Sequence, residues 1–174
     1  PAEIDYSGDH QEFTLNKELS QKLRALTQYY GITLNSVLLS SVNILLSKYT
    51  GQNDIIIGTP IAGREHVDLQ NQVGLYINTL AIRTRFKEEI TFSNLLKYQK
   101  ETLLGAYENS DYSLNDLINQ LKFKRDASRS ALFDVMVVLQ TQQGIANLVN
   151  HDLKGLEIAS YEDIAKEASP FDLT

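Results

Sequence analysis

The sequence predicts a single domain of the α/β class. Its apolar residues recur with period two in some segments and with period 3.6 in others, and the two patterns alternate several times along the chain. The chain has 174 residues, 43% of them hydrophobic, which is enough to bury one core of ordinary size. We therefore expect helices and strands that pack together in one domain.

Two helices are expected early in the chain, after a short strand over residues 10–15 (HQEFTL). Asn16 is placed to cap the first helix and Gly31 to end it, while Thr33 and Gly51 bound the second. The apolar face of the first helix consists of Leu19, Leu23, Leu26 and Tyr30. The broader face of the second consists of Val37, Leu38, Val42, Leu45 and Leu46, widened by Leu39 and Ile44, so this helix is expected to be buried on most sides.

Two strands are expected in the middle of the chain. Residues 54–63 (DIIIGTPIAG) are rich in β-branched side chains, which is typical of an internal strand that leads into a loop. Residues 64–72 are polar and predict a short surface helix. A second strand over residues 76–86 alternates between two faces, neither of them purely apolar. One face carries Ile77, Thr79, Ala81, Arg83 and Arg85, and the other carries Tyr76, Asn78, Leu80, Ile82 and Thr84.

The second half begins with a long helix that starts at Thr91 or Ser93 and carries Leu95, Leu96, Leu103, Leu104 and Tyr107. Residues 113–116 (SLND) match a capping box that opens a short helix with Leu117, Ile118 and Leu121 facing inward. Residues 131–140 (ALFDVMVVLQ) predict a strand. Residues 141–155 then predict a long loop, residues 156–162 a weaker strand, and the last three residues the start of another strand.

Composition excludes several classes of function. The net charge is -6 and no lysine or arginine cluster interrupts the sequence, which argues against nucleic-acid binding. No apolar run approaches the roughly 18 residues of a membrane span, so no membrane partner is expected. The chain has no cysteine, which rules out disulfides and thiolate chemistry within it. The cytoplasm is the expected location.

The residue types contain no self-contained catalytic set. His10, His66 and His151 are scattered without metal-ligand spacing, and His66 is expected to be a solvated surface histidine. Residues 125–129 (RDASR) allow two interpretations. Their charges either pair with one another in a surface connector, which contributes little to stability, or a guanidinium holds a carboxylate or backbone carbonyls near a site.

Four segments resemble motifs of the condensation domains of non-ribosomal peptide synthetases. Residues 73–83 (VGLYINTLAIR) resemble the family's (I/V)GxFVNTLxLR motif, and residues 54–64 (DIIIGTPIAGR) resemble its DIVVGTPVAGR stretch. Residues 109–118 (NSDYSLNDLI) resemble HQDYPFEEL, and residues 125–140 (RDASRSALFDVMVVLQ) resemble RDxSRNPLFDVMF. The four motifs follow the family's order, which makes the resemblance specific.

The chain also departs from the family pattern. Asn109 and Ser110 stand where His-Gln is usual, and Ser130 and Ala131 stand where Asn-Pro is usual. The family's catalytic HHxxxDG motif does not occur in the 174 residues. The resemblance therefore implies that residues 1–174 are the C-terminal subdomain of a condensation domain, without the N-terminal catalytic lobe and without the final strand and helix.

The implied fold is an α/β two-layer sandwich lobe of the chloramphenicol acetyltransferase-like fold, in which two lobes enclose a tunnel. The resemblance implies no catalytic residue in this chain. It implies that Asn78 and Thr79 line the tunnel and supply hydrogen bonds that fix the chain there. It also implies that Arg125, Asp126 and Arg129 shape the site or contact a carrier. It also places a floor loop near residues 73–86 and a latch within residues 141–174. We further expect Arg83 and Arg85 to pair with acidic groups and the lobe to expose an apolar face.

The implied reaction is amide formation between a carrier-bound acyl or peptidyl thioester and an aminoacyl amine. Phosphopantetheine would arrive on the carriers, so no bound cofactor is expected. The implied partners are peptidyl carrier protein domains, the N-terminal lobe and an adjacent adenylation domain, and the chain alone is expected to be inactive. Three alternatives stay open: a non-catalytic carrier-docking or structural module, an epimerization domain and a CoA-dependent acyltransferase.

Overall fold

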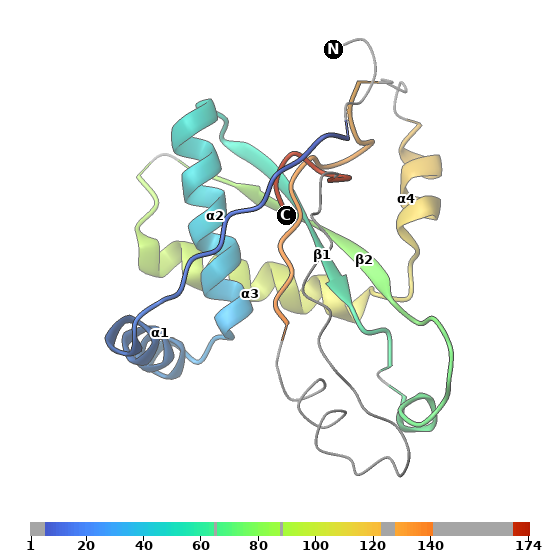
Figure 1. The fold of residues 1–174 in the computed structure, drawn as a ribbon, viewed down its shortest axis with the longest axis horizontal. Coiled ribbons are helices and arrows are strands. Elements are labelled where there is room, and N and C mark those ends of the chain that lie inside the picture. The colour runs from blue at the N-terminus through green and yellow to red at the C-terminus, as the bar shows by residue number, and fades with distance from the viewer. Residues whose placement is uncertain (1–5, 65, 88, 123–127, 141–168) are drawn as a thin grey trace.

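The computed structural model of the protein describes residues 6–64, 66–87, 89–122, 128–140 and 169–174. Helices and strands are mixed along the chain, as the sequence predicts (Figure 1). The elements in chain order are α1 (Lys17–Tyr30), α2 (Leu34–Thr50), β1 (Asp54–Ile61), the 3-10 helix η1 (Val67–Leu69), β2 (Asn78–Arg85), α3 (Phe92–Glu108) and α4 (Leu114–Leu121).

The helices begin where the capping residues predict. The N-caps of the four α-helices are Asn16, Thr33, Thr91 and Ser113, and each side chain accepts a hydrogen bond from the backbone N–H three residues on. Such a bond satisfies a donor that the helix itself leaves unpaired. Of the two predicted starts of α3, Thr91 is therefore the correct one. Gly31 and Gly51 end α1 and α2, as predicted.

β1 and β2 form an antiparallel pair that is in register from Asp54 opposite Arg85 to Ile61 opposite Asn78. On the other side of β1, the backbone N–H of Gly58 donates to Val135 O, and the N–H of Val137 donates to Gly58 O. β1 is thus flanked on both sides, which confirms that it is internal. The predicted strand over residues 131–140 is confirmed only in part, because the described residues form isolated bridges there and no continuous ladder.

The core lies between the hairpin and helices α2 and α3, on one face of the pair. Its buried residues are Leu39, Ile55, Ile57, Leu80, Ile82 and Leu103. Along β2 the even positions are buried from residue 80 onward, while Arg83 and Arg85 are exposed, which confirms the predicted alternation. A second buried cluster consists of Ile32, Val37 of α2 and Leu96 of α3. Helix α1 packs against this cluster through Leu23, Leu26 and Tyr30.

Among the described residues, no single helix is long and apolar enough to cross a membrane. The pair α1 and α2 meets that criterion only by combined length and composition, and the two helices are bent by 104° at their junction.

Several local predictions are wrong. Residues 10–15 form no strand and are exposed, because no neighbouring strand in the described chain pairs with them. Leu45 and Leu121, predicted to face inward, are each 49% exposed. The short surface helix predicted within residues 64–72 is present, but it is the three-residue 3-10 helix η1. The predicted loop 141–155 and strand 156–162 lie outside the described residues.

The buried side of α2 also differs from the predicted stripe. It consists of Ser36, Val37, Leu39, Ser40 and Asn43. Two of these bond back to the helix itself, since Ser40 Oγ donates to Ser36 O and Asn43 Nδ2 donates to Leu39 O. Serine and asparagine side chains can bond to the backbone of their own helix and so occupy buried positions, which a hydrophobicity pattern does not reveal.

Candidate functional site at one end of the hairpin

A cavity of about 680 Å³ lies where β1 ends and β2 begins. We call it the motif cavity; it is lined by Gly63, His66, Leu69, Tyr76, Ile77, Asn78, Ser110, Asp111 and Ser113. These residues come from the segment after β1, from the entry into β2 and from the turn between α3 and α4. Three of the four segments with family resemblance therefore meet at one place: the two arms of the hairpin, and a third segment that begins 26 residues after the second one ends.

Asn78 joins β2 to the turn between α3 and α4. Its Nδ2 donates to Ser110 O at 2.7 Å and to Tyr112 O at 3.2 Å, and its Oδ1 accepts from the backbone N–H of Thr79 at 2.8 Å. A side-chain amide offers two donors and an acceptor on one short arm, which this arrangement uses in full. The predicted role of Asn78 in holding the chain is consistent with these bonds, whereas lining a tunnel stays a prediction.

Thr79 takes part through its backbone, and its side chain is half-buried. Arg64 is a residue that the sequence analysis did not single out. Its guanidinium donates to three backbone carbonyls of the loop between β1 and β2. The one signal in the sequence is its position at the end of the segment that resembles GTPVAGR.

His66 and Asp111 of the cavity are exposed, and Tyr76 is half-buried. His66 caps η1, because its Nδ1 accepts from the backbone N–H of Asp68 at 3.3 Å, and it lies 3.4 Å from the Asp68 carboxylate with 70% of its side chain exposed. This confirms the expected solvated histidine. The described residues contain no cluster of three or more His, Cys, Asp or Glu that could hold a metal ion.

The expected pairing of Arg83 and Arg85 is confirmed at the opposite end of the hairpin. Arg83 donates to Asp54 through Nε at 2.7 Å and through Nη2 at 2.6 Å, and Arg85 Nε donates to the same carboxylate at 3.3 Å. The hydrogen bond from Arg83 holds the pKa of Asp54 at about 2, below its ordinary value of 3.8, and the same bond raises the pKa of Arg83.

The RDASR segment is only partly described. Arg129 forms an ion pair with Asp134, five residues on, and Arg125 and Asp126 lie outside the described residues. Beyond Arg129, Phe133 packs against Gly58 of β1 and stacks on Phe171 with ring centres 5.7 Å apart. The motif cavity does not include Arg129 among its lining residues. A role of these three residues in shaping a site or contacting a carrier stays a prediction.

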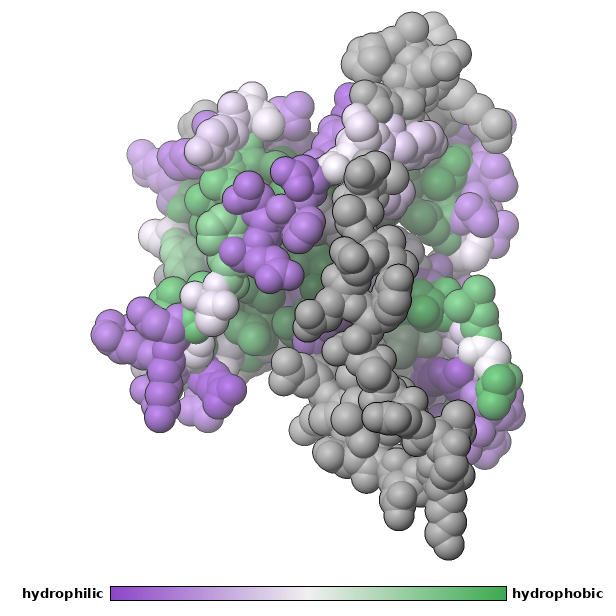
Figure 2. Space-filling view, viewed as in Figure 1, coloured by the Kyte–Doolittle hydropathy of each residue, from purple (hydrophilic) through white to green (hydrophobic). Residues whose placement is uncertain are grey.

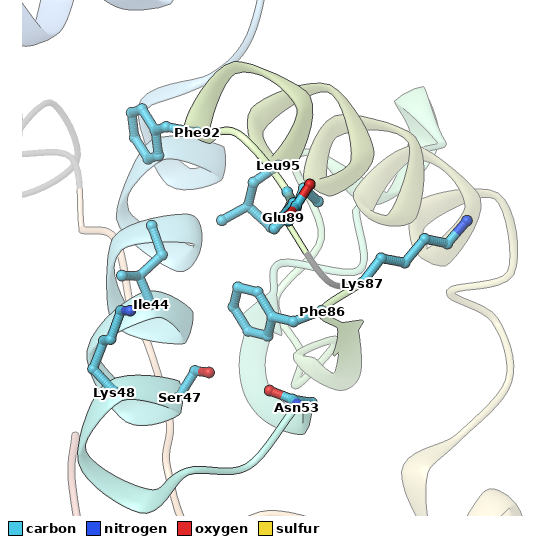
Figure 3. A pocket seen from close by; sticks show the side chains of 10 residues that line it. Ile44, Ser47, Lys48, Asn53, Phe86, Lys87, Glu89, Phe92 and Leu95 are labelled. Atoms are coloured by element: carbon cyan, nitrogen blue, oxygen red, sulfur yellow. The ribbon is translucent and has the colours of Figure 1, made fainter.

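A second cavity of about 440 Å³ lies near the Asp54 end of the hairpin, between α2 and the start of α3 (Figure 3). Phe86 and Leu95 point into it, while Lys87 points away (Figure 3). None of the residues that line it belongs to the four segments with family resemblance. The motif cavity is therefore the better candidate for a functional site.

Apolar side chains are exposed beside the motif cavity. On the loop between β1 and β2, at the lower right of Figures 1 and 2, the exposed fractions are 68% for Val67, 104% for Val73, 87% for Leu75 and 64% for Ile77. The expected apolar surface is thus present. Large apolar side chains grouped in this way are typical of a contact surface.

Comparison with solved structures defines the class of fold. The chain is similar to the condensation domain of the Monacolin K polyketide synthase MokA, with a TM-score of 0.66 and 24% identity over 71% of this chain and 29% of that chain. It is also similar to the four-domain nonribosomal peptide synthetase AB3403, with a TM-score of 0.74 and 24% identity over 84% of this chain and 12% of that chain. The fold is that of condensation domains.

The family follows from sequence. The model of the condensation domain matches residues 1–174, and the chain belongs to this family. It is 41% identical over 174 residues to gramicidin S synthase 2 of Brevibacillus brevis and 43% identical over 176 residues to bacitracin synthase 3 of Bacillus licheniformis, in both cases over 100% of this chain. The chain spans 4% and 3% of the lengths of these two synthases, respectively.

Proposed function

We propose that the chain is the C-terminal lobe of a nonribosomal peptide synthetase condensation domain and forms one wall of the tunnel in which an amide bond is made. The observation that carries the proposal is the motif cavity, because three separate family motifs converge on it. The third motif reaches the cavity through the bonds from Asn78 to the turn between α3 and α4, so the site depends on contacts between separate parts of the fold.

In this proposal the nitrogen of a carrier-bound aminoacyl amine attacks the carbonyl of an acyl or peptidyl thioester. The new C–N bond forms as the C–S bond breaks, the donor carrier's thiol leaves, and the proton lost by the amine balances the thiolate. The imidazole of HHxxxDG belongs to a companion lobe. Much of the rate then comes from holding two tethered substrates in the correct orientation. The residues of this chain shape the wall against which they are held.

The proposed partners follow from the same reading. They are peptidyl carrier protein domains, a companion N-terminal lobe and a neighbouring adenylation domain. The multidomain relatives support this set, since AB3403 is a four-domain synthetase and the chain matches only a small part of each curated relative. Phosphopantetheine enters as the arm of the substrate carriers, without a resident cofactor, and the protein would act in the cytoplasm.

A non-catalytic carrier-docking module is the second candidate. One observation favours it: the side-chain bonds of Asn78 and Arg64 at the motif cavity go to backbone carbonyls and hold the chain in place. On this view the lobe would bind carriers without turning them over.

One assay separates the two candidates. The chain is produced together with its companion lobe and supplied with one carrier loaded with an acyl group and one loaded with an amino acid. Mass spectrometry then follows the mass of the acceptor carrier. Transfer of the acyl group to the acceptor supports the proposed function, and a variant with alanine at the second histidine of HHxxxDG is the negative control. Carrier binding without transfer would support the docking module.

A further inference from the structure

The loop between β1 and β2 is not held by a hydrophobic core. Four of its large apolar side chains, those of Val67, Val73, Leu75 and Ile77, are at least 64% exposed. Its regular structure is limited to the three residues of η1. A loop whose apolar side chains lie in solvent obtains a fixed shape only from polar contacts, since backbone ordering is opposed by conformational entropy.

Arg64 supplies such contacts. Its Nη1 donates to the backbone carbonyls of Leu69 and Gln72, and its Nη2 donates to that of Gly74 at 2.9 Å. The guanidinium carbon also lies 4.5 Å from the centre of the Tyr76 ring. Hydrogen bonds from a charged donor are stronger than neutral ones, and a planar guanidinium presents several donors in fixed directions. The Arg64 side chain thus contacts four residues between positions 69 and 76 and holds this part of the loop together.

Gly63 and Arg64 fix Tyr76 from two sides. Gly63 has a φ of 62°, and a Cβ there would lie 1.9 Å from the backbone oxygen of Tyr76, so only glycine permits this approach. On the ring side, Arg64 lies over the face of Tyr76, whose hydroxyl donates to Gln72 Oε1 at 2.8 Å. Tyr76 and Ile77 then lead directly into Asn78 along the wall of the motif cavity.

We propose that Arg64 is a positioning residue of the condensation reaction: it holds the loop between β1 and β2 so that Tyr76, Ile77 and Asn78 form the wall of the motif cavity. This inference rests on the proposed function. Arg64 acts on the wall and contacts no reacting atom. Lysine cannot replace it, because a single ammonium has neither the fork that reaches three carbonyls nor the planar group that stacks on the ring.

The test uses the intact condensation domain that contains this chain, with both carriers loaded, and compares wild type with R64K and R64A. We expect kcat for amide formation to fall roughly 10- to 100-fold in both variants, because small displacements of a positioning wall are costly to rate. KM for each carrier should stay within about twofold. R85K is the matched control: Arg85 pairs with Asp54 at the far end of the hairpin, so kcat should not change.

Hydrogen–deuterium exchange gives a second measurement. Faster exchange of the amides of residues 69–76 in folded R64K, together with the loss of kcat, supports the proposal. If R64A does not fold, the kcat and the exchange rates of R64K alone decide whether the proposal holds. A wild-type kcat in R64K would overturn the proposed role of Arg64, and so would a lowered kcat with unchanged exchange across the loop. Neither result would contradict the proposed function. If the wild-type domain forms no amide at all, the proposed function is wrong, and the proposed role of Arg64 is wrong as well.

Discussion

Replacing Gly58 with alanine should destabilise the protein by about 1–2 kcal/mol. A Cβ at this position would lie 2.3 Å from Cε2 of Phe133, whereas ordinary contacts begin at 3.4 Å, so the ring or the strand must move by about 1 Å. Overpacking of this kind costs about 1–3 kcal/mol, and the lower entropy of the unfolded chain with alanine offsets about 0.4–1 kcal/mol of it. In a domain of this size, the melting temperature should fall by about 2–8 °C.

Replacing Phe133 with leucine should rescue part of the stability that G58A loses. Phe133 is 7% exposed, and F133L alone should be destabilising because it shortens a buried ring. Since leucine leaves room for the new methyl group, G58A/F133L should be more stable than the sum of the two single effects, with a coupling of about 0.5–3 kcal/mol. Urea unfolding followed by far-UV circular dichroism measures all four proteins.

G105A is the control for the general effect of removing a glycine. Gly105 lies within α3, and a Cβ there meets no atom within 4 Å, so alanine should stabilise by about 0.5–1 kcal/mol. If G58A is as stable as wild type, or if its effect and that of F133L are strictly additive, the contact between Gly58 and Phe133 is not as described.

Three further predictions concern polar contacts. N78A removes the two bonds to the turn between α3 and α4, which should cost about 1–2 kcal/mol and speed amide exchange at residues 109–113; unchanged exchange there would contradict the assigned role. T84V leaves the fully buried Gln99 without the hydroxyl that donates to its Oε1 at 3.0 Å, which should cost about 1–3 kcal/mol, and T84V/Q99L should recover most of that loss in urea unfolding. Because the pKa of Asp54 is lowered to about 2 by its arginine partners, its contribution to stability should be complete above pH 3.8 and vanish as the pH falls through 2. NMR titration of this carboxyl checks the value, and a midpoint near 3.8 would show that the ion pair does not form in solution.

Local signals predicted the helices and the alternation of β2 well. An N-cap such as Asn16 or Ser113 acts on backbone three residues away, and the period of a half-buried strand is a property of neighbouring residues. The pairing of Arg83 and Arg85 with an acidic group was also predicted correctly, although the sequence did not identify Asp54, 29 residues from Arg83, as the partner. The helix caps and the alternation of β2 need no knowledge of how distant segments meet.

The features that sequence patterns missed depend on distant contacts. Asn78 reaches a carbonyl 32 residues away, and the close approach of Gly58 to Phe133 spans an even longer separation. The strand predicted over residues 10–15 failed for the same reason, since a strand exists only where another one pairs with it. Family resemblance drew attention to Asn78. Neither resemblance nor periodicity indicated that Arg64 donates to three backbone carbonyls of the loop between β1 and β2.

The two ends of the hairpin are held by different forces, and Asn78, Arg64 and Gly63 lie at the end that the core does not stabilise. At the middle of the hairpin, apolar side chains such as Ile57 and Ile82 are fully buried beneath α2 and α3. The hydrophobic core does not extend to the motif cavity. There the chain is held by five side-chain hydrogen bonds to backbone carbonyls, three from Arg64 and two from Asn78. Substitutions of Arg64 should therefore change the shape of the cavity at little cost to the free energy of unfolding, whereas N78A should change both.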